Sequence, residues 1–178
     1  FSYKLKPDNR FKWNLSIGRY YKMPTYTMLG YKDNNGNYLN KESKYTRSDH
    51  YVTGFEYNSS NSSRITIEGF YKRYSQYPVS LIDNVSLANK GGGFEVLGNE
   101  PISSDGKGKT YGIETLYQQK LNKNFYGVFA YTFFYSRFTS IEGEYLPSVW
   151  DSRHLISFSG GYKLKKNWEI SARWRFSG

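Results

Sequence analysis

The sequence has no cysteine among its 178 residues, and it has no long apolar run. The absence of cysteine fits a compartment in which thiols would oxidise. A membrane-spanning helix needs about 20 consecutive, mainly apolar residues, and no segment of the chain approaches that length. A chain of this kind that crosses a bilayer must do so as a closed β-barrel, because an open sheet edge cannot face lipid.

The chain is also poor in hydrophobic residues, at 38%, so that no compact apolar core is evident. It is nevertheless 20% aromatic and contains 19 tyrosines. A soluble domain this polar seldom carries so many rings, whereas a transmembrane barrel uses Tyr and Trp as girdles at the two bilayer interfaces. The composition therefore favours a barrel.

A formal net charge of +10 is high enough to suggest a nucleic-acid or anionic-lipid partner. The basic residues are, however, scattered singly along the sequence, with no dense basic run. This pattern is better explained by solvated loops and a polar barrel lumen. We therefore expect no nucleic-acid partner.

Polar and apolar residues alternate along most of the chain with the period of two that is typical of β-strands. In the last segment Trp168, Trp174 and Phe176 fall on one face, whereas Glu169 and Arg173 fall on the other. The alternation predicts antiparallel strands near 1–7, 10–23, 50–58, 63–75, 108–122, 125–139, 152–165 and 167–178.

In a large barrel the apolar face of each strand meets lipid and the polar face meets the lumen. We therefore expect these side chains to point outward: Trp168, Ile170, Trp174, Phe158, Phe129, Phe133, Ile113 and Ile67. We expect these to point inward: Glu169, Arg173, Arg175, Glu114, Glu68 and Lys72. Charges in the lumen pair across strands or contact a plug, which explains them without catalysis.

The connections alternate strictly between short and long. Short turns rich in Asn, Ser, Lys and Pro are predicted at 7–9, 58–63, 122–124 and 165–167, and long polar loops at 25–49, 76–107 and 141–151. Bacterial outer-membrane barrels have short periplasmic turns and long outer loops. The fold class is therefore all-β, an antiparallel transmembrane β-barrel sector of about eight strands.

Both ends of the sequence lie within strand patterns, and no internal domain boundary is visible. We therefore interpret residues 1–178 as a partial outer-membrane β-barrel domain of a longer polypeptide. Its sheet should be open and curved, with segments 1–7 and 167–178 as edges that face missing neighbours.

Four short sequences resemble, in their order and spacing, the C-terminal barrel part of TonB-dependent outer-membrane receptors, particularly those of Bacteroidetes. They are GKTYGIE (108–114), FAYT (129–132), WDSRHL (150–155) and KNWEISARWRFSG (166–178). The resemblance covers nearly the whole chain. GRYY at 18–21, with Pro24, fits the same family upstream.

The resemblance implies active import of a scarce nutrient, such as a siderophore, glycan or peptide, across the bacterial outer membrane. It implies a plugged barrel of about 22 strands, with the plug domain and the terminal strands outside this chain. The implied partners are outer-membrane lipid, the energy-coupling TonB complex through regions outside this chain, the nutrient ligand and a surface lipoprotein. No cofactor is implied.

Candidate chemical sites are few, and we expect neither a catalytic nor a metal site. The GKT sequence at 108–110 lacks the Gly that a phosphate-binding loop needs five residues earlier, where Ser103 stands, and a strand follows it. The Asn-rich segment 33–37 has the wrong register for a calcium loop, so a plain turn is expected. His50 and His154 stand apart from any cluster of metal ligands.

The aromatic residues of the long loops are the best ligand candidates, because a Tyr or Trp ring offers an apolar face and a polar tip to a sugar or chelate. Arg153 is expected beside them in the upper lumen. The predicted ligand-binding residues are Tyr26, Tyr31, Tyr45, Phe94, Tyr145, Trp150 and Arg153, with Tyr38 as a further loop ring.

Two other interpretations remain open from the sequence alone. One is a complete small barrel that serves as a structural anchor or adhesin, since about eight strands can close. The other is a soluble carbohydrate-binding β module, which would explain the tyrosines. The inverted polarity of the strand faces argues against the soluble module.

Overall fold

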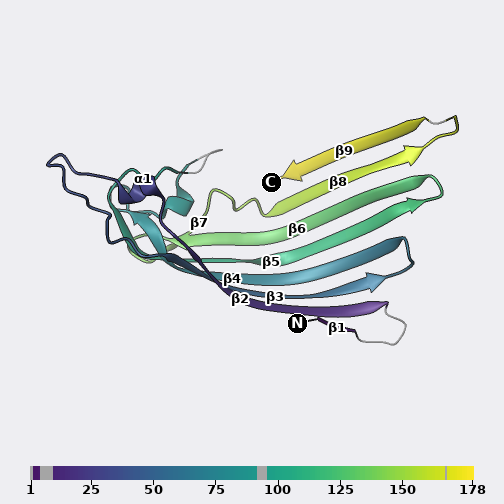
Figure 1. Cartoon of the computed structure of the whole chain (residues 1–178), viewed down its shortest axis with the longest axis horizontal. Helices are drawn as coiled ribbons and strands as arrows, with labels where there is room; N and C mark the ends of the chain where they lie inside the picture. The colour runs from purple at the N-terminus through teal and green to yellow at the C-terminus, as the bar shows by residue number, and fades with distance from the viewer. Residues whose placement is uncertain (1, 5–9, 92–95, 167) are drawn as a thin grey trace.

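The computed structural model describes residues 2–4, 10–91, 96–166 and 168–178. They form one antiparallel sheet in which strands follow chain order, β1-β2-β3-β4-β5-β6-β8-β9, with the short β7 paired to β6 (Figure 1). The strands are β1 (Ser2–Lys4), β2 (Phe11–Lys22), β3 (Thr46–Asn58), β4 (Ser63–Ser80), β5 (Ile102–Asn122), β6 (Phe125–Thr139), β7 (Tyr145–Pro147), β8 (His154–Lys163) and β9 (Glu169–Ser177).

Helical structure in the described residues is limited to α1 (Tyr26–Leu29) and the 3-10 turn η1 (Leu87–Asn89), both within long loops. The predicted all-β antiparallel architecture is therefore confirmed. Within the same residues, no helix has the length and apolar character needed to cross a membrane.

The strand register confirms the predicted grouping of side chains on two faces. Trp174, Phe158 and Phe129 lie opposite one another on neighbouring strands, so their side chains share one face of the sheet. Glu68 lies opposite Glu114, and both share the other face. The apolar residues of the first face are broadly exposed, Ile113 at 54% and Trp174 at 54%, so nothing in the described chain covers them.

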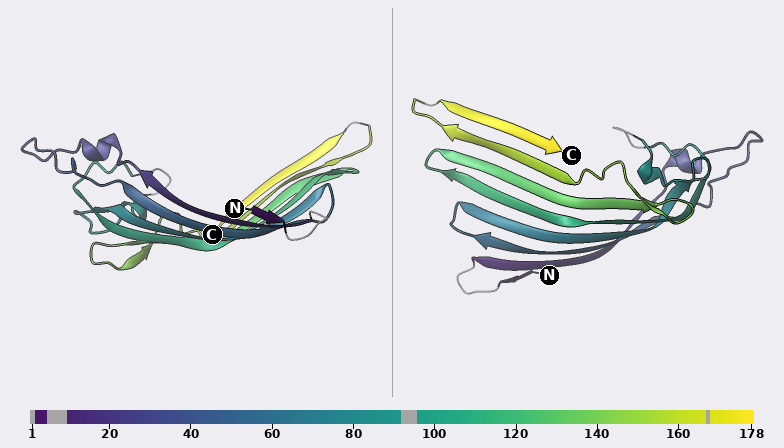
Figure 2. Two further views of the ribbon diagram at one scale, coloured as in Figure 1. Left: turned by 60° about the horizontal axis from the view of Figure 1, so that its bottom comes forward. Right: turned by 180° about the vertical axis from the view of Figure 1, so that it is seen from behind.

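The sheet is curved and open. No pairing joins β1 to β9 in the residues that the structure describes, which confirms the predicted open sector rather than a closed small barrel. Figure 2 shows the strands bending along their length, with α1 on the concave side. Tyr77 packs beside Met28 of α1 and contacts Tyr74 and Phe138, which share the face of Glu68 and Glu114. The charged face therefore lines the concave side, and the apolar face is the outer one.

Several strands are longer than predicted. β4 extends to Ser80 and β5 begins at Ile102. Their ladder continues past a bulge near Gln76, whose φ is +57°. A bulge inserts an extra residue and breaks the period of two, which hides the strand in the sequence pattern. β7 was not predicted at all, since it has only three residues.

The long loops all lie at one end of the sheet, and the short turns between β3 and β4 and between β5 and β6 lie at the other, as predicted (Figure 1). The predicted turn at 7–9 and Asn167 of the turn at 165–167 lie outside the described residues. The long connections span 23–45, 81–101 and 140–153. They pack together into the one compact part of the described chain, around Met28, Leu87 and Ile102.

Candidate functional site

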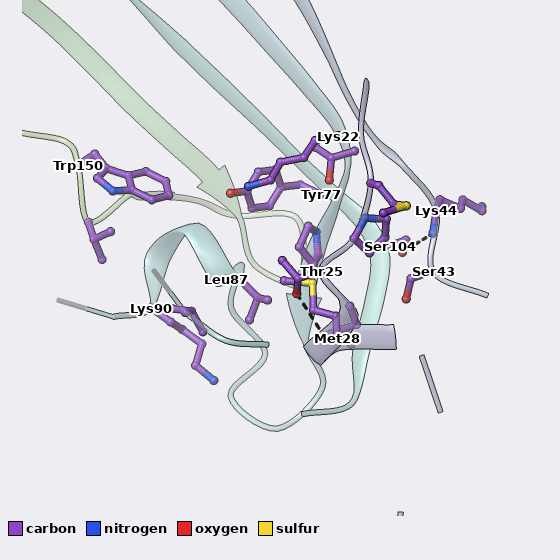
Figure 3. A pocket seen from close by; sticks show the side chains of 17 residues that line it. Lys22, Thr25, Met28, Ser43, Lys44, Tyr77, Leu87, Lys90, Ser104 and Trp150 are labelled. Atoms are coloured by element: carbon purple, nitrogen blue, oxygen red, sulfur yellow. Dashed lines mark hydrogen bonds between the residues drawn. The ribbon is translucent and has the colours of Figure 1, made fainter. Parts of the chain in front are cut away.

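The loop cluster encloses a cavity of about 80 Å³ at the end of the sheet (Figure 3). All three long loops contribute to its lining. Met28, Leu87 and Ile102 give it an apolar side, and Lys22 and Lys44 lie on its wall. Ligand pockets usually measure about 300–1,000 Å³, so this space, with its apolar and cationic walls, has room for one small group of an amphipathic solute and not for a whole ligand.

α1 carries Met28 into this cluster. Thr25 caps the helix, and its side-chain oxygen accepts a hydrogen bond from the Met28 amide at 3.4 Å. Gly98 has a φ of +66°, and a side-chain carbon there would lie 2.5 Å from Cγ of Met28. Only glycine therefore lets the loop before β5 approach Met28 so closely.

Asn40 joins the first long loop, 23–45, to the end of the second loop and the start of β5, from a buried position that is 2% exposed. Its side-chain amide donates to the carbonyl oxygens of Met28 at 3.0 Å and Glu100 at 2.7 Å. Its side-chain oxygen accepts from the Ile102 amide at 3.1 Å. Since buried polar groups are costly unless paired, this fully bonded amide fixes the relative positions of the loops.

Lys90 forms the charged part of the cluster, with its ammonium 2.7 and 2.8 Å from the two carboxylate oxygens of Glu100. Asp83 also pairs with Lys90, and the Ser80 hydroxyl donates to Glu100. Burial of the ammonium lowers the pKa of Lys90, but the hydrogen bonds and charges of Asp83 and Glu100 outweigh burial and leave that pKa raised. Lys90 is thus held as a cation within the loops.

Asp33 organises the turn at 33–37 in the first long loop. Its carboxylate accepts hydrogen bonds from the amides of Asn35 at 2.9 Å and Asn37 at 2.8 Å. The bonds from Asn37 lower the pKa of Asp33 most strongly. These bonds are those of a plain turn, and the described part of the chain contains no group of three metal-ligating side chains.

The structure does not bring the predicted ligand-binding residues together. Trp150 lines the cavity and is 50% exposed. Tyr26, 82% exposed, and Tyr45, 56% exposed, lie on the loop surface outside the lining, as does half-buried Tyr31. Phe94 lies outside the described residues.

Tyr145 and Arg153 lie on the outer face of the sheet. The Arg153 guanidinium is 3.9 Å from the ring centroid of Tyr135, which belongs to the apolar face, and Lys109 of that face lies over the Tyr145 ring at 4.4 Å. The expected position of Arg153 in the upper lumen is therefore wrong. β8 begins only at His154, so strand alternation does not govern Arg153, and Asp151 holds its guanidinium at 3.3 Å.

The sequence analysis missed the cavity-lining residues Met28, Leu87 and Ile102 and the loop-bonding residue Asn40. They stand in irregular loops or at a strand end, where no periodic pattern marks them. The Gly at position 98 and the capping Thr25 are the only local signals near them, and neither specifies a partner.

The concave wall below the loops is polar and partly paired across strands, as predicted. Lys12 of β2 lies 2.9 Å from Glu56 of β3, and Arg64 of β4 lies 3.8 Å from the same carboxylate. The ammonium of Lys12 donates to that carboxylate, which gives a charge-assisted hydrogen bond across two strands.

The family described as TonB dependent receptor-like, beta-barrel matches residues 1–178. No curated protein matches the chain. Three solved structures resemble it in fold. The ferric-catecholate import receptor Fiu from E. coli K12 is 12% identical, with a TM-score of 0.68, over 99% of this chain and 23% of that chain. The ferripyoverdine receptor of the outer membrane of Pseudomonas aeruginosa is 15% identical, with a TM-score of 0.66, over 99% of this chain and 22% of that chain.

The third structure is the copper transporter OprC, 15% identical, with a TM-score of 0.62, over 94% of this chain and 23% of that chain. This chain therefore spans less than a quarter of the length of each of these structures. At such identities the likeness concerns the fold of the sheet.

Proposed function

Because the chain belongs to the TonB dependent receptor-like β-barrel family, we propose that it forms part of the wall of an outer-membrane transporter that imports a scarce nutrient. The single observation that carries this proposal is the sheet itself. One face is apolar and exposed, the other is charged and concave, and all the long loops lie at one end of the sheet. The family is one of receptors rather than enzymes.

Import in this proposal is driven by the energy-coupling TonB complex, through regions outside this chain. The plug domain and the remaining strands of the barrel also lie outside it. We propose that Glu68 and Glu114, which lie opposite each other on the concave wall, contact basic groups of the plug. Two carboxylates on adjacent strands repel each other unless a cation lies nearby.

The nutrient enters from the loop end. Among the structures of similar fold, one protein is named as a ferric-catecholate import receptor, one is bound to ferripyoverdine and one is a copper transporter. For this chain we propose a siderophore, glycan or peptide that meets the outer loops first. Trp150 at the cavity wall is the contact best supported by position, with Tyr26, Tyr31, Tyr45 and Phe94 as further loop contacts.

We also propose that this segment is the C-terminal part of a Bacteroidetes-type barrel, with a surface lipoprotein as a further partner. The support is the ordered set of motifs between 108 and 178. The full-length sequence tests this placement directly. An upstream plug domain and few strands after residue 178 are expected.

Uptake in a strain that lacks the full-length gene tests the transport function. The strain is grown in media limited in turn for iron, for copper and for carbon supplied as glycans or peptides. We expect a growth defect in one medium, rescued by the wild-type gene, and the same defect in a strain without the TonB complex. Normal growth in every medium, with the protein present in the outer membrane, would contradict transport and favour an anchor or adhesin.

Replacing residues 83–99 with a short Gly-Ser linker in the full-length protein tests loop capture. The strand ladders end at Ser80 and begin again at Ile102, so the barrel should fold while uptake weakens. Trp150→Ala is the milder companion variant. Unchanged uptake in both variants would show that the loops do not capture the nutrient and would point to a binding site on the plug.

A further inference from the structure

Four tyrosines form a continuous row across the outer face of the sheet, on adjacent strands β3 to β6. The ring centroids of Tyr51 and Tyr71 are 6.3 Å apart, those of Tyr71 and Tyr111 6.4 Å, and those of Tyr111 and Tyr135 5.3 Å. Rows of Tyr on the outer face of a barrel lie at the level of the lipid headgroups. This row therefore marks the interface nearer the long loops.

Basic side chains follow immediately beyond the tyrosines toward the loops, on the same face. Arg73, Lys109 and Arg137 lie opposite one another on β4, β5 and β6, two residues further along each strand. Arg19 continues the row on β2 beyond Asp49 of β3. We name these four cations the basic row.

The carboxylates nearby do not neutralise this row. Asp49 pairs with Arg19 at 2.5 Å and with Arg47 at 3.6 Å, and its charge also acts on Arg73, which lies opposite it, so this one carboxylate is shared among three guanidinium groups. In the part of the chain that the structure describes, no carboxylate lies within 4.0 Å of a charged nitrogen of Arg73, Lys109 or Arg137. Neighbouring strands are about 4.8 Å apart, and like charges directly opposite destabilise a sheet. Three adjacent cations therefore call for an external anion.

An apolar groove lies directly below the tyrosines on the same face. It has a volume of about 480 Å³, and its outer-face lining includes Leu15, Gly69, Ile113 and Phe133 together with the tyrosine row. Gly69 forms its open floor, since a side-chain carbon added there would meet nothing within 4 Å. The groove therefore has room for a flexible apolar chain.

We propose that this face binds a phosphate-bearing lipid of the outer leaflet, with its phosphate on the basic row and an acyl chain in the groove over Gly69. The order of the three features fits such a molecule: cations at the headgroup level, tyrosines at the interface and apolar surface below. Guanidinium groups bind phosphate oxygens through paired, charge-assisted hydrogen bonds. This inference rests on the proposed outer-membrane location of the barrel.

The experiment uses the full-length protein, purified in detergent and stripped of lipid. The probes are lipid A carrying two phosphates, the same lipid A after removal of its phosphates, and free pyrophosphate. Bound lipid is counted by native mass spectrometry and its affinity is measured by titration. Arg73→Gln/Lys109→Gln/Arg137→Gln removes three outer cations, whereas Lys72→Gln/Arg173→Gln/Arg175→Gln removes three cations from the concave face.

We expect wild type and the concave-face variant to bind phosphorylated lipid A equally. The outer-face variant should bind it at least about tenfold more weakly, and dephosphorylated lipid A should bind weakly to all three proteins. Gly69→Phe fills the groove, so it should weaken lipid A binding while leaving pyrophosphate binding unchanged. Heat-resistant migration in gels verifies that each variant is folded.

Equal binding of phosphorylated lipid A by the outer-face variant and wild type would overturn the proposal, as would an equal loss in the concave-face variant. Unaltered lipid binding by Gly69→Phe would show that the acyl chain does not lie in the groove, and would overturn that part of the proposal. Nutrient uptake is scored separately. Normal uptake without lipid binding defeats only this inference, and lipid binding without uptake defeats only the transport function.

Discussion

Lys90 and Glu100 join the two halves of the loop between β4 and β5 through two hydrogen bonds, 2.7 and 2.8 Å long, from one ammonium to both carboxylate oxygens. Their side chains are only 23% and 13% exposed. The pair closes the loop beside η1 and holds the backbone of the cavity wall in place.

Replacing Lys90 with Met should loosen this loop without unfolding the barrel. The substitution leaves the largely buried carboxylate of Glu100 without its cation, at a cost of about 1–3 kcal/mol. Limited proteolysis of the full-length protein should cut within 81–101 faster than in wild type, while heat-resistant migration persists. Lys41→Met, at an exposed position of the neighbouring loop, is the control. Equal cleavage rates for the two variants would show that the ion pair does not order the loop.

Ile113→Arg should impair folding of the barrel into membranes far more than Glu114→Arg. The two residues are adjacent on β5 and at the same depth, but Ile113 is on the outer face and Glu114 on the concave face, opposite Glu68. An Arg facing lipid costs up to about 2–4 kcal/mol at mid-membrane and less toward the interface, whereas an Arg at position 114 gains a carboxylate neighbour. Yield of folded protein in outer membranes is the measurement. Equal yields would contradict the assigned faces.

Gly112→Ala should destabilise the wall, whereas Gly69→Ala should not. A methyl carbon at Gly112 would overlap the carbonyl oxygen of Phe133 and lie 2.6 Å from Cβ of Phe134. Backbone atoms of a central ladder cannot move aside, so the cost should be about 1–3 kcal/mol. At Gly69 nothing lies within 4 Å. The unfolding temperature in detergent should fall only for Gly112→Ala, and an equal fall for both would refute this packing.

The sequence was sufficient to predict the strands and their faces because alternation is a local signal. Every side chain between Phe125 and Thr139 takes its face from the period of two, and β6 has the predicted bounds. The signal failed where the period itself changes. The bulge at Gln76 brings Tyr77 onto the same face as Tyr74, so that both rings contact Phe138. The ring centroid of Phe138 is 4.5 Å from that of Tyr77 and 5.2 Å from that of Tyr74.

The candidate site was much less predictable. Its walls depend on contacts between distant loops, such as the bonds from Asn40 to the carbonyl of Glu100 and to the amide of Ile102. No spacing in the sequence encodes such contacts. Aromatic character alone did not distinguish Trp150, which lines the cavity, from Tyr145, which lies under Lys109 on the outer face.

The central claim is that this sheet crosses the outer membrane with its long loops outside. Asn34 and Asn61 provide a matched pair for testing it, since both are exposed, one in the loop between β2 and β3 and the other in the short turn between β3 and β4. The chain has no cysteine of its own, so Asn34→Cys and Asn61→Cys each introduce one labelling position into the full-length protein.

The decisive measurement is labelling of these two variants in intact cells with a maleimide that cannot cross the outer membrane. The account predicts that Asn34→Cys is labelled at once, and that Asn61→Cys is labelled only after the outer membrane is permeabilised, with the parent protein as background. Labelling of Asn61→Cys and protection of Asn34→Cys would show the opposite orientation. Equal labelling of both in intact cells would show that the sheet does not cross the membrane.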